Sequence, residues 1–235
     1  SVTTGQFNTL VGGLAGDAIT DSSGNTAMGY AALSTNTTGE FNTAIGREAL
    51  EANLSSDHNT AVGFRAGTAV TTGTQNTLMG SNTGLALTDA DFNTAIGQQA
   101  LATDTKGNKS VAIGHGSLGT QNFTSSTDSF NTAVGYSAGA AITTGIQNTI
   151  LGALAGDALT DADTNVAIGV SALGADTKGN SSVAIGSSAL RLQNFTSSTD
   201  VYNVAIGRAA GENITTGIQN TLIGSLAGDA FTDAD

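Results

Sequence analysis

A polar residue, a Thr or Val, two apolar residues and a glycine form a pentapeptide that returns along nearly the whole chain, and its side chains are expected to alternate between two faces. It reads Asn-Thr-Ala-Ile-Gly at 93–97 and Asn-Val-Ala-Ile-Gly at 203–207. Period-two alternation with branched residues predicts a short strand, and the closing glycine indicates a positive φ or the close approach of another backbone. The closing glycines are Gly12, Gly29, Gly46, Gly63, Gly80, Gly97, Gly114, Gly135, Gly152, Gly169, Gly186, Gly207 and Gly224.

Neighbouring copies of the pentapeptide are separated by a constant 17-residue step, except from 114 to 135 and from 186 to 207, where a 21-residue step replaces it. So short and faithful a period is typical of stacked repeats. We therefore expect an all-β fold, a parallel β-roll or β-solenoid of about 17-residue coils with strands about 4.8 Å apart. A helical array is excluded because mid-segment glycines destabilise helices.

A second pattern divides the array into blocks of four coils. The residue four places after each closing glycine follows the order Gly, Leu, Leu, Gly, and the coils with Gly there carry a large apolar residue three places later, as in Gly67 and Val70. Both coil types are expected to supply one large group to the same interior. The single continuous array, residues 1–235, then consists of blocks 8–75, 76–147, 148–219 and a partial block 220–235.

The interior of such a coil is expected to be thin. Each coil would bury about one Ile, one Leu and two Ala, with a second strand near Ala49–Leu50, while the leading Asn bonds its own turn and stacks on the Asn of the next coil. Ordering a residue costs roughly 1 to 2 kcal/mol. A homotrimeric rod is therefore expected, with a monomeric solenoid as the alternative.

Composition and charge narrow the range of partners. The chain is 39% hydrophobic, 5% aromatic and 11% charged, with a net charge of -12 and no Cys. This acidity argues against nucleic acid, whose phosphates favour clustered Lys and Arg. No apolar run reaches membrane-spanning length, so membrane insertion is not expected. Without Cys there are neither disulfides nor thiolate sites.

Two versions of the motif carry a family resemblance. The segments Ser110-Val-Ala-Ile-Gly114 and Ser182-Val-Ala-Ile-Gly186 resemble the head repeats of YadA-like trimeric autotransporter adhesins. The segment Asn42-Thr-Ala-Ile-Gly-Arg-Glu-Ala-Leu50 is similar to repeats of phage tail-fibre proteins. The resemblance implies a trimeric left-handed parallel β-roll used for attachment, located outside the cell on a virion tail fibre or a bacterial surface. The longer period of this chain departs from the shorter head repeat of the adhesins.

Residues suited to catalysis or metal binding are few. His58 and His115 occupy non-equivalent places, which disfavours a transition-metal site and a His-based triad. The motif Asp89-Ala-Asp91, which recurs at 161–163 and 233–235, offers oxygens to Ca²⁺, but solvated turn carboxylates are the favoured interpretation. Paired carboxylates of a glycan-cleaving site are a further option, yet nothing interrupts the repeat to form a cleft. We expect no enzyme and no cofactor.

The two 21-residue coils carry identical loops at 121–128 and 193–200. Exposed aromatic residues on such loops are suited to contact a cell-surface glycan or protein receptor. The other interpretation is that each Phe folds inward and caps the adjacent coil. The candidate contact residues are Asn122, Phe123, Thr124, Asn194, Phe195 and Thr196.

These features predict a non-enzymatic structural segment of a fibre or adhesin that attaches to a cell surface or host receptor. Two alternatives remain. One is an ice-binding β-solenoid, because threonines recur in register from Thr9 to Thr94, although Val replaces Thr at 111, 166, 183 and 204. The other is the subunit of a self-assembling extracellular filament.

Overall fold

The structure is a computed structural model that describes residues 2–233. Asp235, the last residue of the predicted array and of its third acidic motif, lies outside the described residues. Within 2–233 the chain is all-β and contains no helix, and one parallel strand per repeat builds a β-solenoid, as predicted. The chain divides into two compact units. Unit 1 runs to Ser110 and includes Asn122–Asp128, and unit 2 comprises Val111–Gln121 and the described residues from Ser129 onward.

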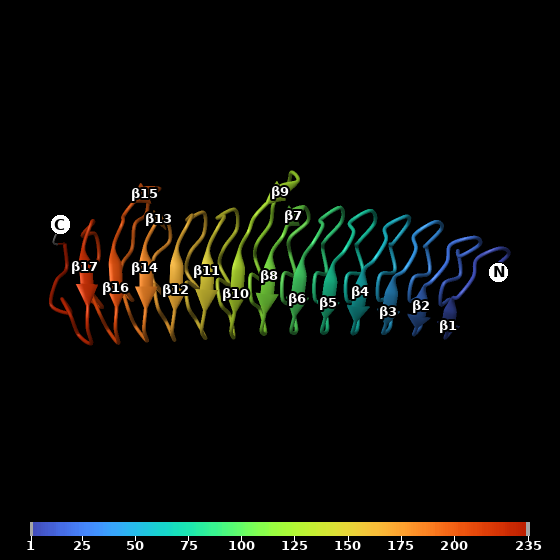
Figure 1. The fold of residues 1–235 in the computed structure, drawn as a ribbon, viewed down its shortest axis with the longest axis horizontal. Coiled ribbons are helices and arrows are strands. Elements are labelled where there is room, and N and C mark those ends of the chain that lie inside the picture. Colours follow the sequence, from blue (N-terminus) through green and yellow to red (C-terminus); the bar gives the residue numbers. More distant parts are fainter. Residues whose placement is uncertain (1, 234–235) are drawn as a thin grey trace. The chain divides into compact units, whose positions relative to one another are not determined.

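Six strands of unit 1 form one parallel sheet in chain order, β1 to β6 (Figure 1). A short parallel pair, β7 with β9, adds a second sheet at the first 21-residue coil. The strands are β1 (Thr9–Val11), β2 (Thr26–Met28), β3 (Thr43–Ile45), β4 (Thr60–Val62), β5 (Thr77–Met79), β6 (Thr94–Ile96), β7 (Gly107–Asn108) and β9 (Thr127–Asp128).

Unit 2 repeats this arrangement with seven strands in the order β8-β10-β11-β12-β14-β16-β17 and the short pair β13 with β15. The short pairs were not predicted, because two-residue strands carry no periodicity. The strands are β8 (Val111–Ile113), β10 (Thr132–Val134), β11 (Thr149–Leu151), β12 (Val166–Ile168), β13 (Gly179–Asn180), β14 (Val183–Ile185), β15 (Thr199–Asp200), β16 (Val204–Ile206) and β17 (Thr221–Ile223).

Equivalent residues of neighbouring coils stand in register. Thr43 pairs with Thr60 and Ile45 pairs with Val62, with no offset along the sheet. Side chains at each position of the repeat therefore form columns within a unit, and any property of one position is multiplied along the unit.

The closing glycines show both expected features, a positive φ and the close approach of another backbone. Their φ angles lie between +126° and +144°. They also stack backbone on backbone, since a β-carbon on Gly29 would lie 2.5 Å from the carbonyl oxygen of Gly46. A side chain at this column, the last position at Gly224 apart, would meet both strain and a clash.

The interior lies behind the middle residue of each strand. Ala44, Ala61 and the other mid-strand alanines are fully buried, as are Leu50 and Val70. The two coil types therefore do supply large groups to one interior. The expectation that each coil buries one Ile does not hold for the strand residue before the glycine: Ile45 is only half-buried and faces outward with Thr43. These two residues lie two apart on a strand, so they share the face opposite Ala44.

The second strand expected near Ala49–Leu50 is also absent: both residues belong to a turn. Leu50 has a φ of +48°, a left-handed conformation that a strand does not tolerate. The equivalent position is left-handed in Gly coils too, as in Gly67 at +58°. The chain thus bends inward here and directs Leu50 into the core.

A ladder of buried asparagines connects the coils. Asn59 Oδ1 accepts a 2.9 Å hydrogen bond from the backbone N–H of Asn76, and Asn59 Nδ2 donates to the carbonyl of Gly73 at 2.8 Å. The predicted stacking of successive asparagines is confirmed, but most of the bonds join different coils rather than one turn. Each asparagine therefore satisfies backbone groups that the interior hides from water.

Candidate functional site

The outward side of the parallel strands is the most extensive candidate surface. We call the first and third residues of the long strands the outer strand face of each unit. In unit 1 it comprises Thr9, Thr26, Thr43, Thr60, Thr77, Thr94, Val11, Met28, Ile45, Val62, Met79 and Ile96. In unit 2 it comprises Val111, Thr132, Thr149, Val166, Val183, Val204, Thr221, Ile113, Val134, Leu151, Ile168, Ile185, Ile206 and Ile223.

This face exposes more apolar surface than a solvated sheet face normally does. Met28, Met79 and Leu151 are 43%, 42% and 47% exposed. A sheet with one wet face usually places polar residues there. A contiguous apolar surface of this kind marks a site of association in soluble proteins.

Aromatic residues add to the exposed apolar surface. Every Tyr, and every Phe except Phe123 and Phe195, is exposed, and most of them lie two residues before or two residues after the outer strand positions. Rings of neighbouring coils contact each other: those of Phe41 and His58 lie 5.3 Å apart and are tilted by 31°, and those of His115 and Tyr136 are stacked at the same distance. The exposed rings belong to Phe7, Tyr30, Phe41, Phe64, Phe92, Phe130, Tyr136, Tyr202 and Phe231.

One charged cluster borders the outer strand face of unit 1. The nearly buried Glu48 carboxylate accepts a 2.6 Å hydrogen bond from Arg65 Nε and a 2.8 Å bond from Arg47 Nε. These guanidinium groups, Arg65 first, hold the pKa of Glu48 below its usual value. The Arg47 guanidinium also lies 5.8 Å from the ring of Tyr30 and 5.9 Å from that of Phe64. These ion pairs and cation–π contacts connect residues of neighbouring coils.

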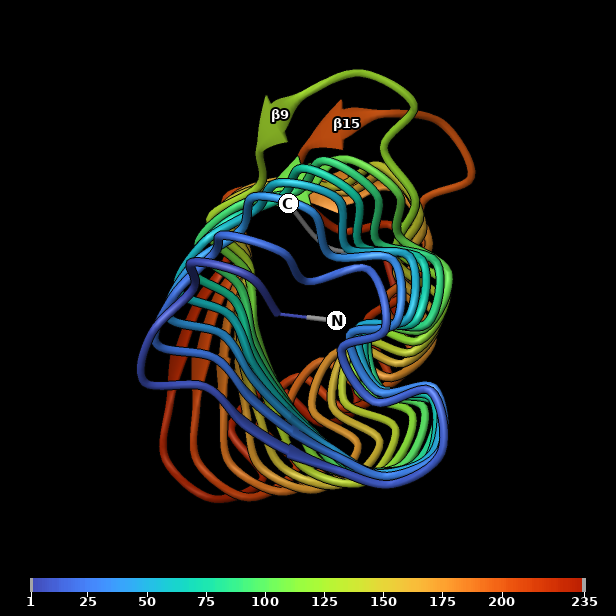
Figure 2. The same cartoon turned by 90° about the vertical axis from the view of Figure 1, so that its right-hand side faces the viewer.

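The loops of the 21-residue coils extend beyond the other coils of their own units, as the segments next to β9 and β15 show (Figure 2). Their phenyl rings nevertheless point inward: Phe123 is 6% and Phe195 9% exposed. The inward-folding interpretation describes both rings. Of the six candidate contact residues, four remain exposed: Asn122, Thr124, Asn194 and Thr196.

A buried polar network holds the loop of unit 2. Asp176 Oδ1 accepts hydrogen bonds from the N–H groups of Gly179 and Phe195, each at 3.0 Å. Gln193 donates to the other Asp176 oxygen at 2.6 Å and accepts a bond from Asn203. Gln193 thereby replaces the asparagine that the ladder lacks at Ser182. The network rigidifies the base of the loop and leaves its tip to solvent.

The acidic turn motifs bond within the protein. Asp91 Oδ1 accepts a 2.6 Å bond from the N–H of Thr74, and Asp163 accepts the equivalent bond from Ile146 at 2.7 Å. Asp89 pairs with Lys106 at 3.4 Å. In residues 2–233 no group of three His, Asp or Glu side chains is arranged to hold a metal ion. The same residues include no helix of the length and apolarity needed to cross a bilayer.

Sequence reasoning missed the outer strand face because it placed the branched column inside. A signal was present: large residues replace Ala at Leu10, Leu78, Ile150 and Leu222, which identifies the Ala column as the one that touches the core. Comparison with family models, with curated proteins and with solved structures gives no match for this chain.

Proposed function

We propose that this chain is a non-enzymatic structural segment of an extracellular attachment fibre, of the phage tail-fibre or bacterial surface adhesin kind. Copies of the chain associate through their outer strand faces, three to an assembly. The observation that supports this is the in-register column of exposed or half-buried Ile, Val, Met and Leu, present in both units. Interface cores are rich in aromatic residues and Met and poor in charge, which matches this face and its flanking rings.

Self-association is tested by sedimentation of the full chain at micromolar concentration. We expect a mass three times the 23.1 kDa of one chain. The double variant Met79→Lys, Leu151→Lys places charge on the outer strand face of each unit and should yield monomers. The matched control Thr72→Lys, Thr144→Lys changes exposed turn residues in equivalent coils and should leave the trimer intact. A monomeric unmodified chain would contradict the proposal.

Attachment is tested separately, by binding of the labelled chain to bacterial cells and to glycans. The exposed loop residues are examined with the double variant Thr124→Ala, Thr196→Ala. Binding that this variant abolishes would assign the contact to the loops. Binding that persists would place the contact elsewhere on the chain, and the absence of any binding would reduce the proposal to a fibre shaft.

Ice binding is the second candidate, favoured by the unbroken threonine column of unit 1, which faces outward in register from Thr9 to Thr94. The exposed side chains of Met28 and Met79 on the same face weigh against it, since they interrupt a flat hydroxyl surface. Inhibition of ice recrystallisation by the chain, abolished by Thr43→Lys and Thr60→Lys, would favour this candidate over attachment. A self-assembling filament subunit would instead appear in sedimentation as open-ended growth rather than a closed trimer.

A further inference from the structure

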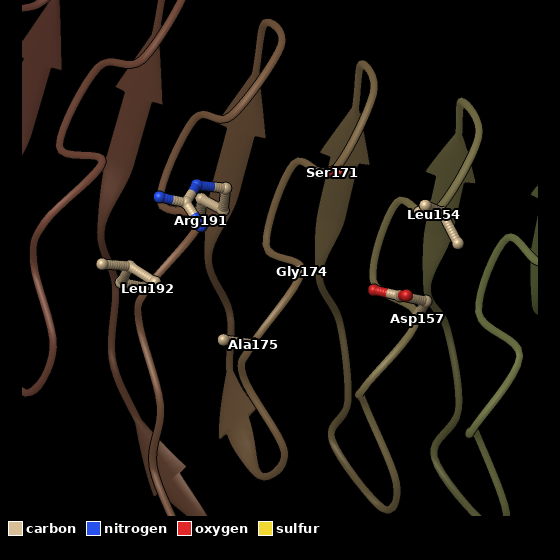
Figure 3. Close-up of a pocket in the computed structure, with 7 residues that line it drawn as sticks. All are labelled: Leu154, Asp157, Ser171, Gly174, Ala175, Arg191 and Leu192. Carbon is tan, nitrogen blue, oxygen red and sulfur yellow. The ribbon is translucent and has the colours of Figure 1, made fainter.

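Unit 2 contains a cavity of about 200 Å³ that opens on the side of its coils (Figure 3). Asp157 and Arg191 stand on either side of it, and Gly174 lies on the coil between them. Leu154 and Leu192 provide apolar walls. The coils of Asp157 and Arg191 are two steps apart, which places their backbones about 10 Å from each other.

Gly174 widens the cavity because it has no side chain. This glycine is not required by the backbone: its φ is not in the left-handed region, and a β-carbon would meet nothing closer than the Ser171 carbonyl at 3.2 Å. The Asp157 carboxylate would lie 3.6 Å from that β-carbon. Gly174 differs in this respect from the closing glycines, and its effect is to leave space between a carboxylate and a guanidinium.

The polar groups of the cavity suit a neutral ligand with hydroxyl groups. The Asp157 carboxylate is half-buried, and its one hydrogen bond within the described part of the chain comes from its own backbone N–H. Burial raises its pKa, and its remaining acceptor positions are open to a ligand. Arg191 Nε donates to Glu212 at 2.8 Å. With Asp157 and Glu212 both nearby, an anionic ligand is disfavoured, while hydroxyls can donate to Asp157 and accept from the remaining N–H groups of Arg191.

The residues that line the cavity are not repeated in the preceding block. Every lining position differs between blocks 76–147 and 148–219: for example Leu85 corresponds to Asp157, Ala102 to Gly174 and Gly119 to Arg191. Other turn positions differ as well, such as Gly116 and Ser188, so the divergence is general to the turns. Its result at this place is a set of side chains that the second block lacks.

We propose that this cavity binds one neutral saccharide ring. Asp157 and Arg191 hydrogen-bond hydroxyls on opposite edges of the ring, and Leu154 and Leu192 contact its apolar faces. The span of two coils accommodates one pyranose with a hydrogen bond at each side. The inference rests on the proposed attachment function, to which it adds a site and a class of receptor.

Saturation-transfer NMR on the full chain tests the site with glucose, galactose, mannose and N-acetylglucosamine as probes. We expect saturable transfer to at least one of them, with a dissociation constant of roughly 1 mM. Gly174→Gln fills the cavity and should weaken binding at least tenfold, and Asp157→Leu should do the same. The matched control Ala102→Gln, at the equivalent place of the preceding block, should bind like the unmodified chain.

Circular dichroism must show that each variant melts as the unmodified chain does. Transfer that is absent for all four sugars, or that Gly174→Gln leaves unchanged in a folded protein, would overturn the proposed site. The result is distinguishable from that of the attachment and sedimentation assays. Loss of sugar transfer in Gly174→Gln supports the site whether or not the chain forms trimers, whereas a monomeric chain that still binds sugar contradicts the proposed fibre and leaves the site in place.

Discussion

Leu78 occupies the space that Gly67 leaves open in the neighbouring coil. A β-carbon on Gly67 would lie 2.6 Å from Cδ1 of Leu78. Gly84, in the coil of Leu78 itself, leaves space on the other side, where a β-carbon would lie 2.9 Å from Cδ2. The Gly-Leu-Leu-Gly order along the chain is thus a packing rule: two glycine coils meet around one large mid-strand residue.

This rule predicts a strong coupling between the two positions. Gly67→Leu should destabilise by about 3 kcal/mol through overpacking, and Leu78→Ala by about 3 kcal/mol through the cavity it leaves. Because Leu50 shows that a left-handed leucine is tolerated at this column, the double variant resembles a leucine coil that keeps Val70 in its core. In urea unfolding, the free energy of unfolding of the double variant should be at least about 1 kcal/mol higher than the sum of the two single effects predicts. Additive effects would mean that the two side chains do not compete for one space.

The asparagine ladder should be sensitive to single substitutions. Asn59→Ala leaves the N–H of Asn76 and the carbonyl of Gly73 without their partners in a buried place. We expect a loss of about 2 to 4 kcal/mol, from about 1 to 3 kcal/mol for each unsatisfied group. Thr60→Ala, the next residue but outward-facing, should change the urea midpoint little. Equal urea midpoints for the two variants would show that water takes over the hydrogen bonds of the missing asparagine.

The buried phenylalanines of the loops should stabilise the fold. Phe195→Ala removes a buried ring and should destabilise by about 3 kcal/mol. Thr196→Ala, exposed at the loop tip, should fall within about 0.5 kcal/mol of the unmodified chain. Differential scanning calorimetry distinguishes the two, and an unchanged melting temperature for Phe195→Ala would mean that the ring does not cap its coil.

Acid should weaken unit 1 through Glu48. Its pKa is lowered in the folded chain by Arg65 and Arg47, so its contribution is present above the unfolded pKa and is lost as pH falls through the folded pKa. Melting temperature should therefore fall more steeply below about pH 4.5 in the unmodified chain than in Glu48→Gln. The difference should shrink in 1 M salt, which screens partly exposed ion pairs. Parallel curves for the two proteins at low salt would contradict this role.

Much of the fold was predictable because the repeat is short and its residues small. The register, the coil length and the parallel order follow from the recurrence of motifs such as the one that Gly97 closes. The outer strand face was missed, although a large residue in the Ala44 column, Leu78, indicates which side of the strand is enclosed. The sequence does not indicate how each coil closes, because it closes through left-handed residues such as Leu50 and Glu48, which no helix or strand propensity predicts.

The candidate functional residues were likewise predictable only in part. The loops with Phe123 and Phe195 were conspicuous as sequence, yet their rings serve the interior. The Gly174 cavity was not predicted, since a glycine, a carboxylate and an arginine that lie one repeat apart look like ordinary variation until the coils bring them together.

The order of Gly and Leu coils also makes the four-coil block, rather than the single coil, the unit that can be exchanged. A block ends on a Gly coil, such as that of Gly67, and the next begins on a Gly coil, such as that of Gly84, with Leu78 packed between them. Insertion or deletion of a whole block keeps this contact, so the length of such a protein can change in steps of four coils without a mismatch in the core.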